Sequence, residues 1–256
     1  MVLPARLSLG LAGALGPDLT ARLAPAAEEA GFATLWVNDT PGGDAVAALA
    51  AAARVTERIA LATGVVPLDR QGPDALVSAL QAADLPPDRL TVGIGSGAAR
   101  THQLGLVERG IEALRAGVPG AQVVVGALGP RMRSLAVSVG DGQLLNWLTP
   151  AAAAAQRQSD ARTILYVRTA LDAAAQPRLS AEADAYAGYP AYAANFARLG
   201  FSARDTVITS RDDTARVTAY RAAVDEVVLR AIVEKDDPEH YLDFIRNAAG
   251  FMDVDV

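Results

Sequence analysis

Five short segments in the first 150 residues lie at the ends of apolar runs and carry polar side chains, and three of them are rich in glycine or other small residues. Small residues leave backbone N–H groups accessible, and the N-terminus of a following helix adds positive potential, so such segments can bind anions. The best candidate contains Arg131, with Arg133 close behind it in the next helix. The same glycines also make tight strand-to-helix turns, and for any single segment that structural interpretation stays open. The five segments are 38–40, 63–67, 95–98, 126–131 and 146–150.

The apolar runs that must position these segments predict a parallel sheet. They are continuously apolar, as in buried parallel strands, and successive runs lie about one strand and one helix apart. Eight such runs predict a (β/α)8 barrel, an α/β fold whose active face is the C-terminal end of the strands. A doubly wound open sheet is the alternative, but no G-x-G-x-x-G follows the first run. The predicted strands are 6–11, 34–38, 59–65, 90–94, 122–126, 143–147, 163–169 and 226–233.

Helix end signals occur between the predicted strands. Asp44 is expected to cap a helix that runs to Thr56, and Pro73 is expected in the first turn of the next helix. Asp18 or Thr20 is expected to cap the first helix, which contains Pro25. The long last connection predicts two helices, 179–199 and 214–223, with Gly200 ending the first. Its aromatic residues at helical spacing are interpreted as core or dimer contacts; they are Tyr186, Tyr189, Tyr192 and Phe196.

Composition excludes several classes of function. The chain has 256 residues, 51% of them hydrophobic, which suits one barrel domain spanning 1–256. Its net charge of −6 argues against nucleic-acid binding. With no cysteine and only two histidines, we expect no disulfide, no thiolate nucleophile and no metal site.

The chain is predicted to be cytoplasmic and not to contact a membrane. No apolar run reaches the length of a membrane span. Residues 7–15 have the length of a signal-peptide core, but leucines alternate there as in a strand.

Several motifs, taken in order, resemble the luciferase-like monooxygenase superfamily. They include Leu35-Trp36-Val37-Asn38-Asp39 and Gly126-Ala127-Leu128-Gly129-Pro130-Arg131, and segments 56–65, 88–97 and 141–150 continue the resemblance. Residues 189–201 resemble the branch that uses coenzyme F420. The resemblance implies a barrel, usually a homodimer, that binds a flavin or deazaflavin at the C-terminal face of its strands.

The resemblance also implies roles for individual residues. A non-proline cis peptide is expected between Gly64 and Val65, behind the cofactor ring. Asp39 is expected near the polar edge of the ring, and residues 127–131 at the cofactor phosphate. The full set of implied cofactor-binding residues is Asn38, Asp39, Thr63, Gly64, Val65, Gly95, Ser96, Gly97, Ala127, Leu128, Gly129, Pro130, Arg131 and Asn146.

The chain departs from the family at positions that carry acid–base chemistry. Sugar-phosphate dehydrogenases of the family have His and Glu where this chain has Thr40 and Ala98, so that activity is not expected. Asp39 and His102 are the candidate catalytic residues, although a surface or capping role for His102 stays open. Segments 100–121 and 201–214 also lack blocks that the family usually has around the cofactor mouth.

Three hypotheses remain after the sequence analysis. The first is hydride transfer between F420 and a small organic substrate of unknown identity. The second is an FMN-dependent monooxygenase on the same barrel. The third is a shortened barrel without catalysis that only binds a cofactor or a partner.

Overall fold

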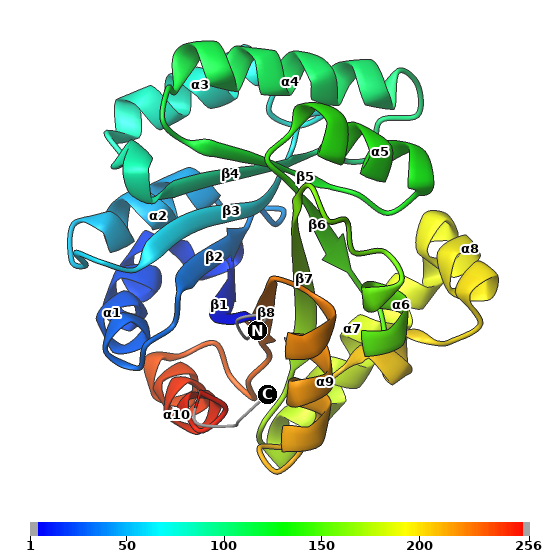
Figure 1. Cartoon of the computed structure of the whole chain (residues 1–256). Coiled ribbons are helices and arrows are strands. Elements are labelled where there is room, and N and C mark those ends of the chain that lie inside the picture. The colour runs from blue at the N-terminus through cyan, green and yellow to red at the C-terminus, as the bar shows by residue number, and fades with distance from the viewer. Residues whose placement is uncertain (1–4, 253–256) are drawn as a thin grey trace.

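Eight parallel strands close into a barrel in the computed structural model, which describes residues 5–252 (Figure 1). Strand order follows the sequence, and β1 pairs with both β2 and β8. The closed order confirms the (β/α)8 fold and excludes the open sheet. The ends of the predicted domain, 1–4 and 253–256, lie outside the described residues. The strands are β1 (Arg6–Ala12), β2 (Thr34–Asn38), β3 (Ala60–Pro67), β4 (Leu90–Gly95), β5 (Gln122–Gly126), β6 (Gly142–Asn146), β7 (Arg162–Thr169) and β8 (Glu226–Ala231).

Helices surround the barrel, and α8 stands at the outside of this ring (Figure 1). Within residues 5–252, no helix is long and apolar enough to cross a bilayer. The α-helices are α1 (Gly16–Glu29), α2 (Ala45–Ala53), α3 (Pro73–Ala83), α4 (Gln103–Gly117), α5 (Pro130–Val139), α6 (Pro150–Ala154), α7 (Gln176–Gly188), α8 (Pro190–Leu199), α9 (Thr214–Ala223) and α10 (Pro238–Ala249). The short 3-10 helices are η1 (Gly13–Leu15), η2 (Pro87–Arg89), η3 (Ala173–Ala175) and η4 (Ala203–Thr206).

Two helix starts are confirmed and one is wrong. The Asp44 carboxylate accepts a hydrogen bond from the Ala47 N–H, and Pro73 opens α3. Helix α2 ends at Ala53, before the predicted Thr56. Neither Asp18 nor Thr20 caps α1, because the helix already starts at Gly16 and contains both residues.

The predicted helix 179–199 is wrong as one piece. Proline lacks the N–H that a continuous helix needs. The helix is interrupted at Tyr189, whose backbone is extended, and a new helix begins at Pro190. Helices α7 and α8 therefore take separate directions. Gly200, at φ 78°, ends α8 as predicted.

A buried polar cluster joins four strands at the start of β8. Glu226 is fully buried, and its Oε1 accepts hydrogen bonds from Ser8 Oγ (2.6 Å) and Trp36 Nε1 (2.7 Å). Its Oε2 pairs with Arg162. The cluster lies at the N-terminal ends of β7 and β8, the face of such a barrel that serves stability.

The third strand carries the predicted irregularity. The peptide bond between Gly64 and Val65 is cis, which confirms the prediction. The register of β3 against β4 shifts between Thr63 and Val66. Val65 lies within this shift.

Candidate functional site

A cavity of about 560 Å³, here called the central pocket, opens at the C-terminal ends of β2 to β7. Ten of the residues predicted to bind a cofactor line it. Segments far apart in the sequence meet there because parallel strands end at one face of a barrel. The ten are Asn38, Gly64, Val65, Gly95, Ser96, Gly97, Ala127, Leu128, Gly129 and Asn146.

The remaining predicted residues lie outside the central pocket. Thr63 is fully buried, and its hydroxyl exchanges two hydrogen bonds of 2.9 Å with the backbone of Gly93. His102, Pro130 and Arg131 line a neighbouring depression of about 570 Å³, here called the outer hollow. The outer hollow shares Gln103, Gly129 and Met132 with the central pocket, so the two are adjacent.

Asp39 is held by Arg70, from the loop after β3, and by the start of α2, and it does not line the pocket. Its carboxylate pairs with Arg70 at 2.7 Å and accepts a 3.3 Å hydrogen bond from the Ala45 N–H. Burial raises its pKa, while Ala45 and Arg70 oppose the rise. This arrangement suits a residue that fixes the loop after β2.

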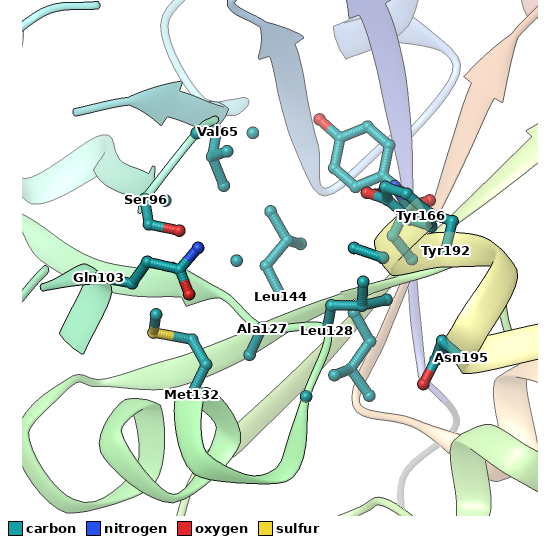
Figure 2. A pocket seen from close by; sticks show the side chains of 18 of the residues that line it. Val65, Ser96, Gln103, Ala127, Leu128, Met132, Leu144, Tyr166, Tyr192 and Asn195 are labelled. Atoms are coloured by element: carbon teal, nitrogen blue, oxygen red, sulfur yellow. Dashed lines mark hydrogen bonds between the residues drawn. The ribbon is translucent and has the colours of Figure 1, made fainter. Parts of the chain in front are cut away.

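Half of the pocket residues that the sequence did not indicate lie on α8, and most of the others lie on β6 and β7 or at the starts of α4 and α5. Figure 2 shows Tyr166 and Tyr192 on one side of the cavity, with Ser96, Gln103 and Met132 on the other. Tyr192, interpreted as a core or dimer residue, packs against the buried cluster that contains Trp147 and Phe196, and it also lines the central pocket. Tyr166 lies inside β7 rather than at its end. The only sequence signal for a role in the pocket was a hydroxyl group within an otherwise apolar run. The missed residues are Gln103, Met132, Leu144, Leu145, Tyr166, Ala191, Tyr192, Ala194, Asn195 and Arg198.

Two polar atoms beside the pocket have no hydrogen-bond partner, namely Asn38 Oδ1 and the Tyr166 hydroxyl. The Asn38 amide nitrogen donates to the Gly64 carbonyl, which fixes the Asn38 side chain. A Cβ atom at Gly64 would collide with the Tyr166 hydroxyl. Asn38 and Tyr166 therefore both contact the backbone at Gly64. Burial raises the pKa of Tyr166, and its hydroxyl therefore stays protonated. Leaving these two buried polar atoms without partners costs folding free energy.

Glycines make room for Val65 at the pocket wall. A Cβ atom at Gly126 would lie 2.9 Å from Val65 Cγ1, and one at Gly95 would lie 3.0 Å from Val65 Cγ2. Both approaches are closer than ordinary packing allows. Glycine at these two strand ends therefore lets Val65 form part of the pocket surface.

A buried arginine supports Asn146 from behind the pocket. Arg168 is 3% exposed, donates from Nε to Glu182 at 2.9 Å, and also donates to Asn146 Oδ1. Its guanidinium lies 4.4 Å from the ring centroid of Trp147 and 4.8 Å from that of Tyr186. Burial opposes ionisation of Glu182, but the charges of Arg168 and Arg230, together with the hydrogen bond from Arg168, outweigh it, so the pKa of Glu182 lies below its usual value.

The charged side chains that line the central pocket and the outer hollow are arginines within the described chain. No acidic residue lines either depression within the described chain, although the protein carries an excess of acidic residues. The outer hollow holds Arg100 and Arg131, and the central pocket holds Arg198. This local excess of cations favours an anionic ligand.

Comparison with known proteins adds family evidence to this geometry. Residues 1–113 match the luciferase-like monooxygenase family. The luciferase-like match runs from β1 into α4, and within it the predicted superfamily resemblance is confirmed.

A curated relative is similar to about half of the chain. It is the Mycobacterium tuberculosis protein named "Putative coenzyme F420-dependent oxidoreductase", 37% identical over 125 residues. The similarity covers 49% of this chain and 30% of the relative.

Solved structures with the luciferase-like fold cover nearly the whole chain. An F420-dependent secondary alcohol dehydrogenase, in complex with an F420-acetone adduct, has a TM-score of 0.74 at 12% identity, over 97% of this chain and 99% of its own. The monooxygenase RslO1 from Streptomyces bottropensis has a TM-score of 0.73 at 19% identity, over 96% and 98%. At these identities the likeness concerns the fold.

Proposed function

We propose that the chain binds coenzyme F420 in the central pocket and transfers a hydride between it and a small organic substrate. The observation that carries the proposal is a pocket at the C-terminal face of the barrel that is lined by ten of the predicted cofactor-binding residues, and whose one charged lining residue within the described chain, Arg198, is a cation. The F420-dependent curated relative supports the choice of cofactor. So does the likeness in fold to an F420-dependent alcohol dehydrogenase.

The residues present fit a planar cofactor with an anionic side chain. The volume of about 560 Å³ lies within the range of small-molecule sites. Asn38 and Tyr166 line the pocket and fix its shape, although Asn38 Oδ1 and the Tyr166 hydroxyl are themselves buried. Val65 and Leu144 supply apolar contact, and residues 127–129 lie beside the N-terminus of α5, which favours negative charge.

The contribution of the chain is to position the reactants and to exclude water. F420, when bound, supplies the hydride-carrying ring. Val65, Leu144 and Leu145 keep water from one side of the pocket, while Asn146 is held in place by Arg168. Fixed groups of this kind lower the entropic cost of bringing two reactants together.

The second candidate is FMN-dependent monooxygenation at the same site, which the name of the matching family and the fold of RslO1 favour. Titrating the purified protein with F420 and, separately, with FMN separates the two functions. A shifted deazaflavin absorbance band with no response to FMN supports the proposal, and the reverse selects the monooxygenase. Binding of neither selects the shortened barrel without redox activity.

Replacing Arg131 by alanine is expected to weaken binding of an anionic cofactor. The side chain is exposed in the outer hollow at the start of α5, so its attraction is partly screened. We expect an affinity about threefold lower at low salt and a flatter salt dependence. Fluorescence titration at two ionic strengths measures both effects.

Arg22 provides the matched control for Arg131. It is an exposed arginine on α1 that lines neither depression, so Arg22→Ala should leave both quantities unchanged. An Arg131→Ala protein with the affinity of the wild type at both salt concentrations would remove Arg131 from the site.

The homodimer and the cytoplasmic location remain predictions from the sequence. Light scattering of the purified protein measures the first, and cell fractionation measures the second. A monomer in solution at micromolar concentration would contradict the dimer prediction.

A further inference from the structure

A further cavity, here called the β8 pocket, opens at the C-terminal ends of β8 and β1 and has a volume of about 360 Å³. Within the described chain, four charged side chains line it, namely Arg178, Glu182, Arg230 and Asp236. The central pocket, by contrast, is lined by one charged side chain of the described residues. The β8 pocket is therefore suited to a different part of a ligand from the planar ring proposed for the central pocket.

The strand register places Arg230 on the inner face of the barrel. Arg230 pairs in register with Arg168 of β7 on one side and with Gly10 of β1 on the other. Side chains alternate along a strand, so Arg230 lies on the same face of β8 as Val228, which belongs to the buried cluster around Trp36. The side chain of Arg230 therefore reaches the β8 pocket from the mouth of the barrel.

The carboxylates of the β8 pocket are already paired with arginines other than Arg230. Asp236 pairs with Arg178 at 2.8 Å, and Glu182 pairs with the buried Arg168 at 2.9 Å. Burial opposes ionisation of Asp236, but its hydrogen bonds and the charges of Arg178 and Arg230 outweigh it, so the pKa of Asp236 lies below its usual value. Both carboxylates are therefore ionised at neutral pH, and three arginines share two negative charges.

Arg230 is the cation of this group without an acidic partner. Within residues 5–252 it makes no ion pair, and its guanidinium donates to the neutral carbonyl of Ala231. A guanidinium carries five N–H donors, so most of those of Arg230 are free for a ligand. The excess of one positive charge attracts an anion, whereas the two carboxylates of the lining repel a dianion. The charges of the β8 pocket therefore favour a ligand with a single negative charge.

Apolar side chains complete the lining of the β8 pocket. Leu15 and Leu19 come from η1 and α1, and Ile232 and Val233 come from the segment that follows β8. An arginine beside apolar walls fits a carboxylate group attached to a short hydrocarbon body.

The β8 pocket lies next to the central pocket. Asn38 lines the central pocket, and Thr40, two residues further along the chain, lines the β8 pocket. Arg168 donates both to Asn146 of the central pocket and to Glu182 of the β8 pocket. A molecule held by a residue of the β8 pocket would therefore lie beside a cofactor bound in the central pocket.

We propose that the β8 pocket is a subsite for a small apolar monocarboxylate, whose carboxylate group binds Arg230. The proposal rests on the proposed function in that it assigns the organic substrate of the hydride transfer to this chemical class. Binding of the acid itself needs no cofactor, so the subsite has a test of its own.

Butyrate is the probe, and its neutral amide, butyramide, is the comparison. The melting temperature of the purified protein is measured over a range of each compound at constant ionic strength. We expect butyrate to raise the melting temperature of the wild type by about 3–5 °C at ten times its Kd, and butyramide to have no effect. Equal shifts with the two compounds, or no shift with butyrate, overturn the subsite.

Two variants of Arg230 test the contact itself. Arg230→Met keeps most of the side-chain volume and removes the charge, so it should bind butyrate about 10- to 100-fold more weakly than the wild type. Arg230→Lys keeps the charge without the planar fork, so it should retain part of the response. Arg204→Ala is the control, since Arg204 is exposed, pairs with Asp184 and lines none of the three cavities. If Arg230→Met is less stable than the wild type but gains as much from butyrate, Arg230 only balances charge within the fold and the proposal is wrong.

Failure of the proposed function gives a different result from failure of the subsite. If only the proposed function fails, the wild type binds no F420, yet butyrate still stabilises it and does not stabilise Arg230→Met. If only the subsite fails, the wild type binds F420 and butyrate has no effect beyond that of butyramide.

Discussion

Replacing Glu226 by alanine is expected to lower the free energy of unfolding by about 3–5 kcal/mol. The carboxylate is fully buried and accepts from Ser8, Trp36 and Arg162, which belong to β1, β2 and β7. Removing it leaves a cation and two neutral donors without their common acceptor inside the barrel. Urea unfolding followed by tryptophan fluorescence measures the loss, because Trp36 is part of the cluster.

Glu226→Gln separates the charge from the hydrogen bonds. The amide oxygen can still accept from Ser8 and Trp36, whereas the attraction to Arg162 is lost. We expect a smaller loss of stability than with alanine. If Glu226→Ala unfolds within 1 kcal/mol of wild type, the cluster does not hold the strands together.

The barrel could be predicted from the sequence because its strands carry one strong local signal. Runs such as 122–126 are apolar on both faces, and β5 has the predicted bounds. The wrong predictions concern helix ends, where capping residues and helical periodicity indicate different boundaries. The first helix starts before both of its predicted caps, and the break at Pro190 was hidden within a continuous helical pattern.

The pocket could be predicted only where its residues follow strands. Strand ends such as Asn38 and Gly126 meet at one face by topology, so their sequence positions were sufficient. Arg198 and Tyr192 lie on α8, and the direction of that helix depends on packing rather than on periodicity. His102 and Arg131 follow strands too, yet they face the outer hollow because α4 and α5 begin there.

Replacing Arg168 by alanine is the second change with a large expected effect. Its guanidinium lies against both the Trp147 and Tyr186 rings and pairs with Glu182, so it attaches α7 to β7. Removing it leaves Glu182 without its partner, at an expected cost of about 3–5 kcal/mol in the free energy of unfolding. Asn146 loses its donor at the same time, so ligand affinity is expected to fall as well. Urea unfolding gives the first quantity, and near-UV circular dichroism reports the changed surroundings of Trp147.

The pH dependence of the free energy of unfolding distinguishes the ion pair of Arg168 and Glu182 from packing alone. The folded-state pKa of Glu182 is lowered, so the stability that it contributes is present at neutral pH and is lost as the pH falls through that pKa. The difference in stability between wild type and Arg168→Ala should therefore shrink below about pH 4. Arg204→Ala removes an exposed partner of Asp184 on the same helix and should cost about 0–1 kcal/mol. If Arg168→Ala costs no more than this control, or the same amount at every pH, the buried pair does not fix α7 against the barrel.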